Sequence, residues 1–87
     1  MKLSAELSLY PLAEEYRPVI RRFIEALQQW DGLTIRVNTM STQIFGDYDQ
    51  VMAALTTELK EVYTEVPAQS LVCKFINRDL TPDDSPD

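Results

Sequence analysis

A chain of 87 residues with a net charge of −6 has room for one hydrophobic core. It contains no histidine, one cysteine and two glycines, which removes the commonest acid–base side chain, the usual zinc ligands and a glycine-rich phosphate loop. No apolar run approaches the roughly 20 residues of a membrane span, and the basic residues form no stripe for nucleic acid. We therefore expect a cytoplasmic, non-catalytic protein that holds no metal or cofactor and binds neither nucleic acid nor membranes.

The negative charge is concentrated at the C-terminus. Residues 79–87 read DLTPDDSPD and hold four aspartates and no base, so they account for four of the six net charges. The segment also lacks the apolar periodicity that a helix or a strand requires. We predict one folded domain over residues 1–78 and a disordered acidic tail over residues 79–87.

The first half of the chain predicts a strand and a helix. Apolar and polar side chains alternate strictly over residues 3–10, as in a strand with one face on the core. The polar side of this strand carries Ser4, Glu6, Ser8 and Tyr10. A helix follows, because apolar residues recur every three or four positions from Tyr16 to Trp30. Pro18 fits in its first turn, and Gly32 can take the left-handed conformation that often ends a helix.

The second half of the chain repeats the pattern. Alternation over residues 33–38 predicts another strand, whose polar side carries Thr34, Arg36 and Asn38. A short third strand over residues 43–45 follows a polar turn and should end at Gly46. Asp47 is a good N-cap for a second helix, and Gln50, three residues later, would complete a capping box.

With a final strand over residues 70–77, the order is β-α-β-β-α-β. Two such units with right-handed crossovers make an α+β, ferredoxin-like fold, which is a four-stranded antiparallel sheet with two helices on one face. The other face is left open to solvent, to a ligand or to a second subunit. Because the first strand is central in this topology, Glu6 lies in the middle of that face, and we expect Arg36 on a neighbouring strand to be its partner.

The segment NTMSTQIFGDYDQ at residues 38–50 holds more polar groups than a hairpin turn requires. Strand termination and helix capping account for its second half. The polar side chains that remain are those of Asn38, Ser41 and Thr42. They either bond the local backbone or hold a polar ligand.

Three segments together resemble a known family. They are AELSLYPL at residues 5–12, FIEAL at residues 23–27 and NTMSTQIFGDYDQV at residues 38–51. They are similar to the thiamine-binding protein family, small ferredoxin-like proteins related to the YkoF thiamine- and hydroxymethylpyrimidine-binding proteins, and the resemblance spans residues 3–77. It implies binding of thiamine or its hydroxymethylpyrimidine precursor without chemistry, and assembly into homodimers or homotetramers.

The implied ligand suggests roles for residues on and beside the open sheet face. The candidate ligand-binding residues are Glu6, Ser8, Tyr10, Asn38, Ser41, Thr42 and Phe45. The ring of Tyr10 or Phe45 would stack on the ligand or meet its thiazolium cation. Glu6 would accept the exocyclic amine or balance the positive charge, and the polar groups of the turn would bond ring nitrogens or the hydroxyl arm.

Two other functions fit the same fold. The open face could serve only for homo-oligomerisation in a structural or interaction module, or the chain could be an amino-acid-binding regulatory domain. The scarcity of Lys and Arg in the motif segments disfavours a phosphorylated ligand. Thiamine and its precursor, and dimer and tetramer, remain alternatives at this point.

Overall fold

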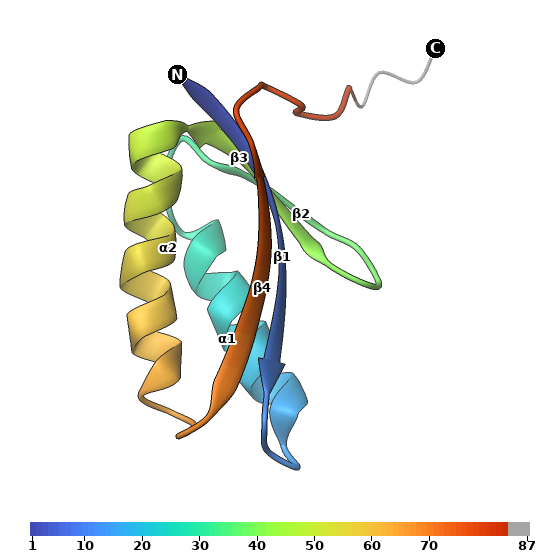
Figure 1. Cartoon of the computed structure of the whole chain (residues 1–87), viewed down its shortest axis with the longest axis vertical. Helices are drawn as coiled ribbons and strands as arrows, with labels where there is room; N and C mark the ends of the chain where they lie inside the picture. Colours follow the sequence, from blue (N-terminus) through green and yellow to red (C-terminus); the bar gives the residue numbers. More distant parts are fainter. Residues whose placement is uncertain (84–87) are drawn as a thin grey trace.

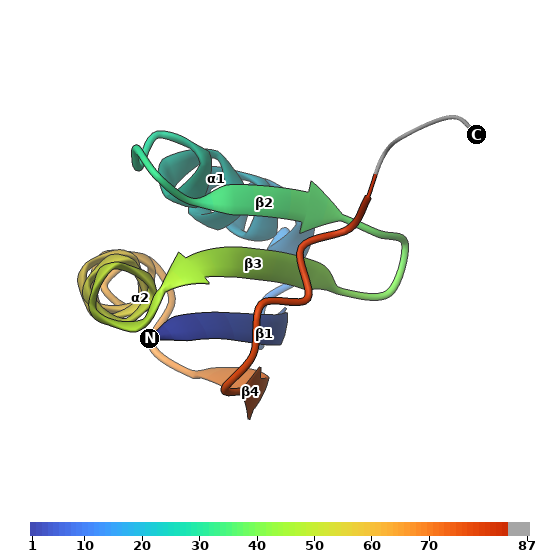
Figure 2. The ribbon, with the colours of Figure 1, turned by 90° about the horizontal axis from the view of Figure 1, so that it is seen from above.

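The computed structural model describes residues 1–83, and it confirms the predicted order of elements and the ferredoxin-like α+β fold (Figure 1). The elements are β1 (Lys2–Pro11), α1 (Tyr16–Gln28), β2 (Thr34–Val37), β3 (Thr42–Asp47), α2 (Tyr48–Tyr63) and β4 (Gln69–Ile76). The strands pair antiparallel in the order β2-β3-β1-β4, and both helices lie on one face of the sheet (Figure 2). Within residues 1–83, neither helix is long and apolar enough to span a bilayer.

The core fills the space between the sheet and the helices. As the alternation predicts, β1 contributes four side chains that are at most 7% exposed, those of Leu3, Ala5, Leu7 and Leu9. They belong to one cluster with apolar side chains of both helices, namely Val19, Phe23, Leu27, Val51, Ala54, Leu55 and Val62. Burying a large apolar side chain is worth roughly 1.5–3 kcal/mol, so this cluster is what holds both helices on the same face.

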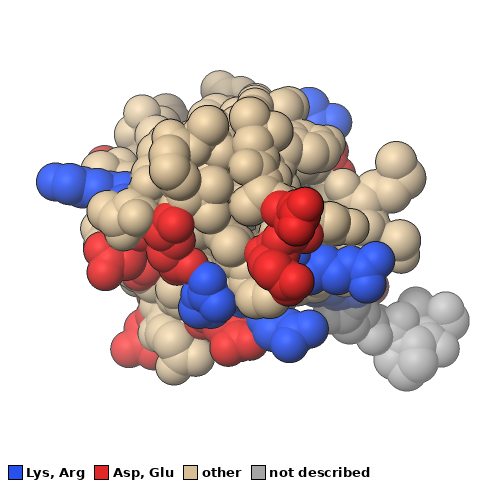
Figure 3. Space-filling view, turned by 90° about the horizontal axis from the view of Figure 1, so that it is seen from below, with Lys and Arg blue, Asp and Glu red and all other residues tan. Residues whose placement is uncertain are grey.

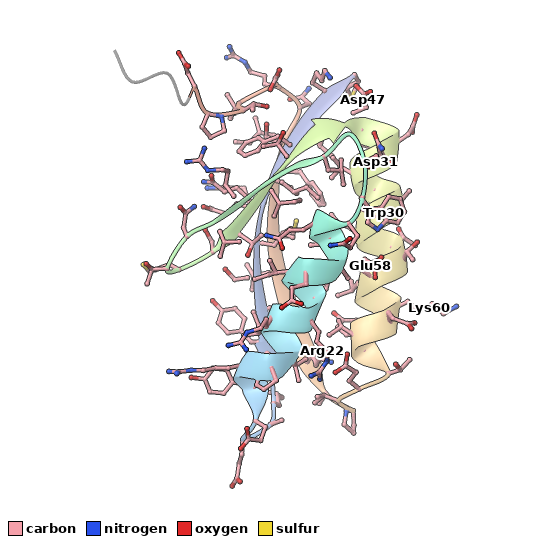
Figure 4. The ribbon with its side chains drawn as sticks, turned by 180° about the vertical axis from the view of Figure 1, so that it is seen from behind. Arg22, Trp30, Asp31, Asp47, Glu58 and Lys60 are labelled. Atoms are coloured by element: carbon pink, nitrogen blue, oxygen red, sulfur yellow. The ribbon has the colours of Figure 1, made fainter. Side chains whose placement is uncertain are left out.

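Two polar contacts link the two helical segments (Figure 4). One joins the loop after α1 to α2, and the other joins α1 to the loop after α2. The indole Nε1 of Trp30 donates to Glu58 Oε2 at 2.8 Å, which gives the last residue of the apolar stripe a partner for its one N–H. Arg22 donates through its guanidinium to Glu65. This hydrogen bond lowers the pKa of Glu65 and raises that of Arg22.

The start of α2 differs from the prediction. Asp47 occupies the N-cap position, but its side chain makes no capping bond and lies 3.3 Å from Lys2 Nζ. The antiparallel register of β1 and β3 places these two residues opposite each other, so the ion pair is within reach. Gln50 donates to the carbonyl of Asp31 and not back to the cap, so the predicted capping box is wrong.

The chain after β4 turns back across the open face of the sheet and passes over β1 and β3 (Figure 2). We call residues 77–83 the strap. Ser4 anchors it, because its hydroxyl donates to the Arg78 carbonyl at 2.7 Å and accepts from the Leu80 N–H at 2.9 Å. Ser4 is only 4% exposed as a result, although it lies on the face that no helix covers.

The acidic segment that we predicted as a tail begins inside the strap. The Asp79 carboxylate accepts from the hydroxyl of Thr81 at 2.6 Å and from its N–H at 3.0 Å. These bonds close a short turn and lower the pKa of Asp79. Residues 79–83 of the predicted tail thus belong to the strap, and residues 84–87 lie outside the described residues.

Gly46 does not end β3, which continues through Asp47. A Cβ atom at Gly46 would meet Leu33 Cδ2 at 2.6 Å and the Gly32 carbonyl at 3.3 Å, because the loop after α1 passes close to the strand. Position 46 therefore requires glycine for a close approach and not to stop a strand. Gly32 has a φ of +82°, the left-handed conformation expected of it.

We predict that Gly46→Ala lowers the free energy of unfolding by about 1–3 kcal/mol, because the added carbon overpacks the contact with Leu33. Urea unfolding followed by circular dichroism measures the change. Ser70→Ala, at an exposed position of β4, is the control and should shift stability by less than about 0.5 kcal/mol. A Gly46→Ala protein as stable as the wild type would show that the loop moves aside without cost.

Candidate functional site

The structure divides the seven predicted ligand residues between two hollows. The first, which we call the α1 groove, lies between the end of β1, one side of α1 and the loop joining β2 to β3, and has a volume of about 560 Å³. The predicted residues that line it are Ser8, Tyr10, Asn38, Ser41 and Thr42. The second, the strap pocket, has a volume of about 410 Å³ and is lined by Glu6 and Phe45 together with strap residues.

The walls of the α1 groove are mostly apolar. Several large apolar side chains that remain exposed gather there, namely Tyr10, Leu12, Tyr16, Val37 and Met40. Ile20 and Ile24 of α1 add to the same lining. A concave apolar surface with a few polar groups at one side is the usual form of a small-molecule site.

Hydrogen bonds hold the loop of residues 38–41 against β1. The N–H of Asn38 donates to the Ser41 carbonyl at 2.8 Å and closes the loop. The Ser41 hydroxyl donates to Glu6 Oε2 at 3.0 Å, and the Ser8 hydroxyl donates to the Met40 carbonyl at 3.3 Å. Part of the high polar content of this segment therefore serves to fix the loop, as the turn interpretation of the sequence allowed.

These bonds decide what the polar side of the groove offers a ligand. The hydroxyls of Ser8 and Ser41 donate their hydrogens within the protein, so toward a ligand their oxygens can act only as acceptors. The bonds from Ser41 and then from Lys74 lower the pKa of Glu6, which keeps a negative charge beside Ser41 at neutral pH. Within residues 1–83, no lysine or arginine lines the groove. These groups favour a ligand that donates hydrogen bonds or carries positive charge, while the Asn38 amide, which also lines the groove, can both donate and accept.

Thr42 lies on the opposite face of the sheet from Glu6. It is in register with Leu7 of β1, whose side chain belongs to the core, and it is only 7% exposed. Because side chains alternate along a strand, Thr42 shares the helix-covered face and reaches the α1 groove from there. The expectation that Asn38, Ser41 and Thr42 all lie beside the open face is therefore wrong for Thr42.

Glu6 has a different partner from the one expected. β3 lies between β1 and β2, so Arg36 is in register with Gln43 and is not on a strand next to Glu6. The neighbour of Glu6 on the other side is Lys74 of β4, whose Nζ lies 3.3 Å from Glu6 Oε1. Both side chains are partly exposed, so this ion pair is worth little to stability.

Phe45 offers little surface to a ligand. Its position in β3 places it on the open face opposite Ser4, yet it is only 5% exposed. The strap residues Leu80 and Pro82 line the same pocket and account for this covering. Phe45 and Glu6 are therefore separated from the other five candidates, except through the bond from Ser41 to Glu6.

Residues of α1 complete the groove, and we did not identify them from the sequence. Tyr16, Ile20 and Ile24 belong to the apolar stripe that predicted the helix, and Tyr16 is 43% exposed. The available signal was the length of the stripe, which extends toward the N-terminus of α1 beyond the buried Val19. An apolar stripe that is longer than the core it covers indicates a further contact surface.

The charged and thiol groups of the described residues form no cluster suited to a metal ion. Within residues 1–83, no cluster of three potential metal ligands occurs. Burial raises the pKa of the Cys73 thiol to about 11, so it stays protonated near neutral pH. Figure 3 shows the end of the molecule where β1 ends and α1 begins, with acidic and basic side chains intermixed around an uncharged area.

A family model described as thiamine-binding protein matches residues 5–80 of the chain. The chain belongs to the thiamine-binding protein family. The matched region includes every residue that lines the α1 groove, and it extends to Leu80 in the strap. No curated protein matches the chain.

Several solved structures share the fold. A Streptococcus pneumoniae protein is 26% identical to this chain, with a TM-score of 0.83. The aligned region covers 92% of this chain and 90% of that protein. A Thermotoga maritima protein assigned provisionally to thiamine biosynthesis or salvage is 20% identical with a TM-score of 0.79, covering 90% and 85%. A hypothetical protein of Methanocaldococcus jannascii is 24% identical with a TM-score of 0.78, covering 98% and 88%. The last two likenesses show the fold alone.

We predict that Ser41→Ala raises the pKa of Glu6 toward its ordinary value, because the hydroxyl is the largest cause of its lowering. A carboxyl-detected NMR titration of the Glu6 side chain measures the pKa in both proteins. Ser70→Ala, on the same face of the sheet but beside Tyr10, is the control and should leave it unchanged. An unaltered Glu6 pKa in Ser41→Ala would mean that the loop is not held to β1 by this bond.

Proposed function

We propose that this protein binds thiamine or its hydroxymethylpyrimidine precursor in the α1 groove and does not transform it. Membership of the thiamine-binding protein family supports the ligand class. The observation that carries the location is the combination of an apolar groove with hydroxyl acceptors whose hydrogens are already committed. Its volume of about 560 Å³ lies in the range of small-molecule sites.

The proposed ligand matches the groove group by group. The aminopyrimidine carries an exocyclic amine, which would donate to Ser41 Oγ and to Ser8 Oγ. The aromatic rings would stack on Tyr10, which is 54% exposed beside the groove. Arg17 covers one face of the Tyr16 ring, with its guanidinium carbon 5.8 Å from the ring centre, so Tyr10 is the better stacking surface.

Charge supports free thiamine or the pyrimidine alcohol over a phosphate ester. Glu6 lies directly behind Ser41 and carries a negative charge at neutral pH, which favours the thiazolium cation. Phosphate groups are usually held by Arg, Lys or backbone N–H groups, and no lysine or arginine lines the groove within residues 1–83. Each phosphate would therefore lower affinity.

The proposal has two further parts. The protein acts as a binding protein and not as an enzyme, in the cytoplasm, as we expected from its composition. It assembles with copies of itself, as the family resemblance implies. An interaction module with no metabolite, the first alternative above, would show no saturable ligand binding, and an amino-acid-binding domain would prefer amino acids to thiamine.

We predict that thiamine binding weakens by roughly 2- to 30-fold in Tyr10→Ala, which corresponds to the loss of about 0.5–2 kcal/mol of stacking and cation–π energy. Isothermal titration calorimetry of the full chain with thiamine and with hydroxymethylpyrimidine measures the affinities. Tyr48→Ala removes another exposed tyrosine, at the start of α2 and far from the groove, and should bind as the wild type does.

Two results would contradict this proposal. The absence of heat with either ligand at millimolar concentration would remove the function itself. Equal affinity in the wild type and in Tyr10→Ala, with binding intact, would keep the function but move the site away from the α1 groove.

A further inference from the structure

A row of polar side chains crosses the open face of the sheet and forms one end of the strap pocket. It consists of Gln43 on β3, Glu6 on β1 and Lys74 on β4, which are in register with one another. Lys74 Nζ lies 3.3 Å from Glu6 Oε1. Among the described residues, these two are the only charged ones that line the pocket. The polar end therefore presents one positive and one negative charge side by side.

The other end of the strap pocket is apolar. In the next row of the sheet, Phe45 and Ile76 lie on either side of Ser4. The Ser4 hydroxyl binds two backbone groups of the strap and holds it over this row, where Figure 2 shows it crossing the sheet. Leu80 and Pro82 of the strap complete the lining. The strap thus supplies an apolar wall that the sheet alone would not have.

The two charged side chains keep some capacity to bind a ligand. A lysine ammonium has three donors, and the ion pair with Glu6 occupies one of them. Hydrogen bonds from Ser41 and Lys74 lower the pKa of Glu6, so it is charged at neutral pH. The Lys74 side chain is 68% exposed and that of Glu6 is 38% exposed, so a ligand can reach both charges.

We propose that the strap pocket is a second binding site, and that it takes a small zwitterion with an apolar side chain, which is the chemistry of an apolar α-amino acid. The ligand carboxylate binds Lys74, and its ammonium binds Glu6. An α-amino acid carries both charges on one carbon, which suits the short distance between Lys74 Nζ and Glu6 Oε1. The pocket volume of about 410 Å³ lies in the range of small-molecule sites.

The apolar end of the pocket receives the ligand side chain. Ile76 is 38% exposed and Leu80 is 44% exposed, so a side chain that packs between them removes apolar surface from water. Phe45 lies beneath the strap in the same lining and is already buried. A ligand without a side chain would leave this end of the pocket to water, so we expect the site to discriminate against small polar zwitterions.

Ligands with a single charge fit the polar end less well. A simple carboxylate would bind Lys74 but would lie close to the negative charge of Glu6. A simple amine would bind Glu6 but would meet the positive charge of Lys74. Like charges at such short range repel, and the repulsion is stronger where a pocket wall excludes water. In a zwitterion each charge has an opposite partner, which is why this ligand class is preferred over acids and amines.

Titration of the ¹⁵N-labelled full chain with leucine, followed by amide chemical shifts, tests the site. We expect saturable shifts centred on Phe45, Lys74 and Leu80. Lys74→Gln should weaken leucine binding by about tenfold, because it removes a charge-assisted hydrogen bond to the carboxylate. The ion pair that it also removes is exposed, so the fold should tolerate the change. Lys60→Gln makes the same change on α2 and should bind leucine as the wild type does.

Three analogues of leucine test the ligand class. Isocaproate lacks the ammonium, isoamylamine lacks the carboxylate, and glycine lacks the side chain. Each should bind more weakly than leucine, by about fivefold or more, because each leaves one part of the pocket without its partner. Leu80→Ser removes apolar surface from the strap and should weaken leucine binding by roughly threefold while leaving glycine binding unchanged.

Four results would overturn this proposal. They are the absence of saturable shifts with leucine, equal affinity for leucine and its three analogues, equal leucine affinity in the wild type and in Lys74→Gln, and leucine shifts centred on Ser8 and Tyr10. The last would place leucine in the α1 groove. The proposal does not depend on thiamine, because thiamine binding is measured at a different set of amides and either proposal can fail alone.

Discussion

The alternation of side chains along β1 is the constraint on which the rest of the structure depends. β1 is central in the sheet and pairs with both β3 and β4. Its apolar side chains form the middle of the core, and its polar side chains fasten the segments on and beside the open face. A shift of its register by one residue would exchange the two faces, so neither set of contacts would survive.

Three polar residues of β1 each have a separate structural partner. Ser4 binds the strap, Glu6 binds Ser41, and Ser8 binds the carbonyl of Met40. The loop that forms one wall of the α1 groove is therefore positioned by hydrogen bonds that use the hydroxyl hydrogens of Ser8 and Ser41. Fixing the loop and setting the polarity of the groove are consequences of the same bonds, which is why the proposed ligand is a donor or a cation.

The fold could be predicted because its signals are local. Apolar residues recur every second position in β1 and every third or fourth position in the helices, and both patterns depend on neighbouring residues alone. The left-handed conformation of Gly32 is likewise a local property. The partner of Glu6 was missed because it depends on which strands are adjacent, and Lys74 is 68 positions away in the chain. The burial of Phe45 was missed for a similar reason, since its covering comes from a segment whose composition favours disorder. The position of Tyr16 in the groove could not be predicted, because an apolar stripe has the same period whether it packs on the core or lines a groove.

The central claim is that the α1 groove, and not the strap pocket, takes the ligand. A titration of the ¹⁵N-labelled chain with thiamine, followed by amide chemical shifts, tests it most directly. We expect saturable shifts centred on Ser8, Tyr10 and residues 38–42, with little change at Phe45 and Leu80. Shifts centred on Phe45, Lys74 and Leu80 would contradict the claim, and so would the absence of saturable shifts.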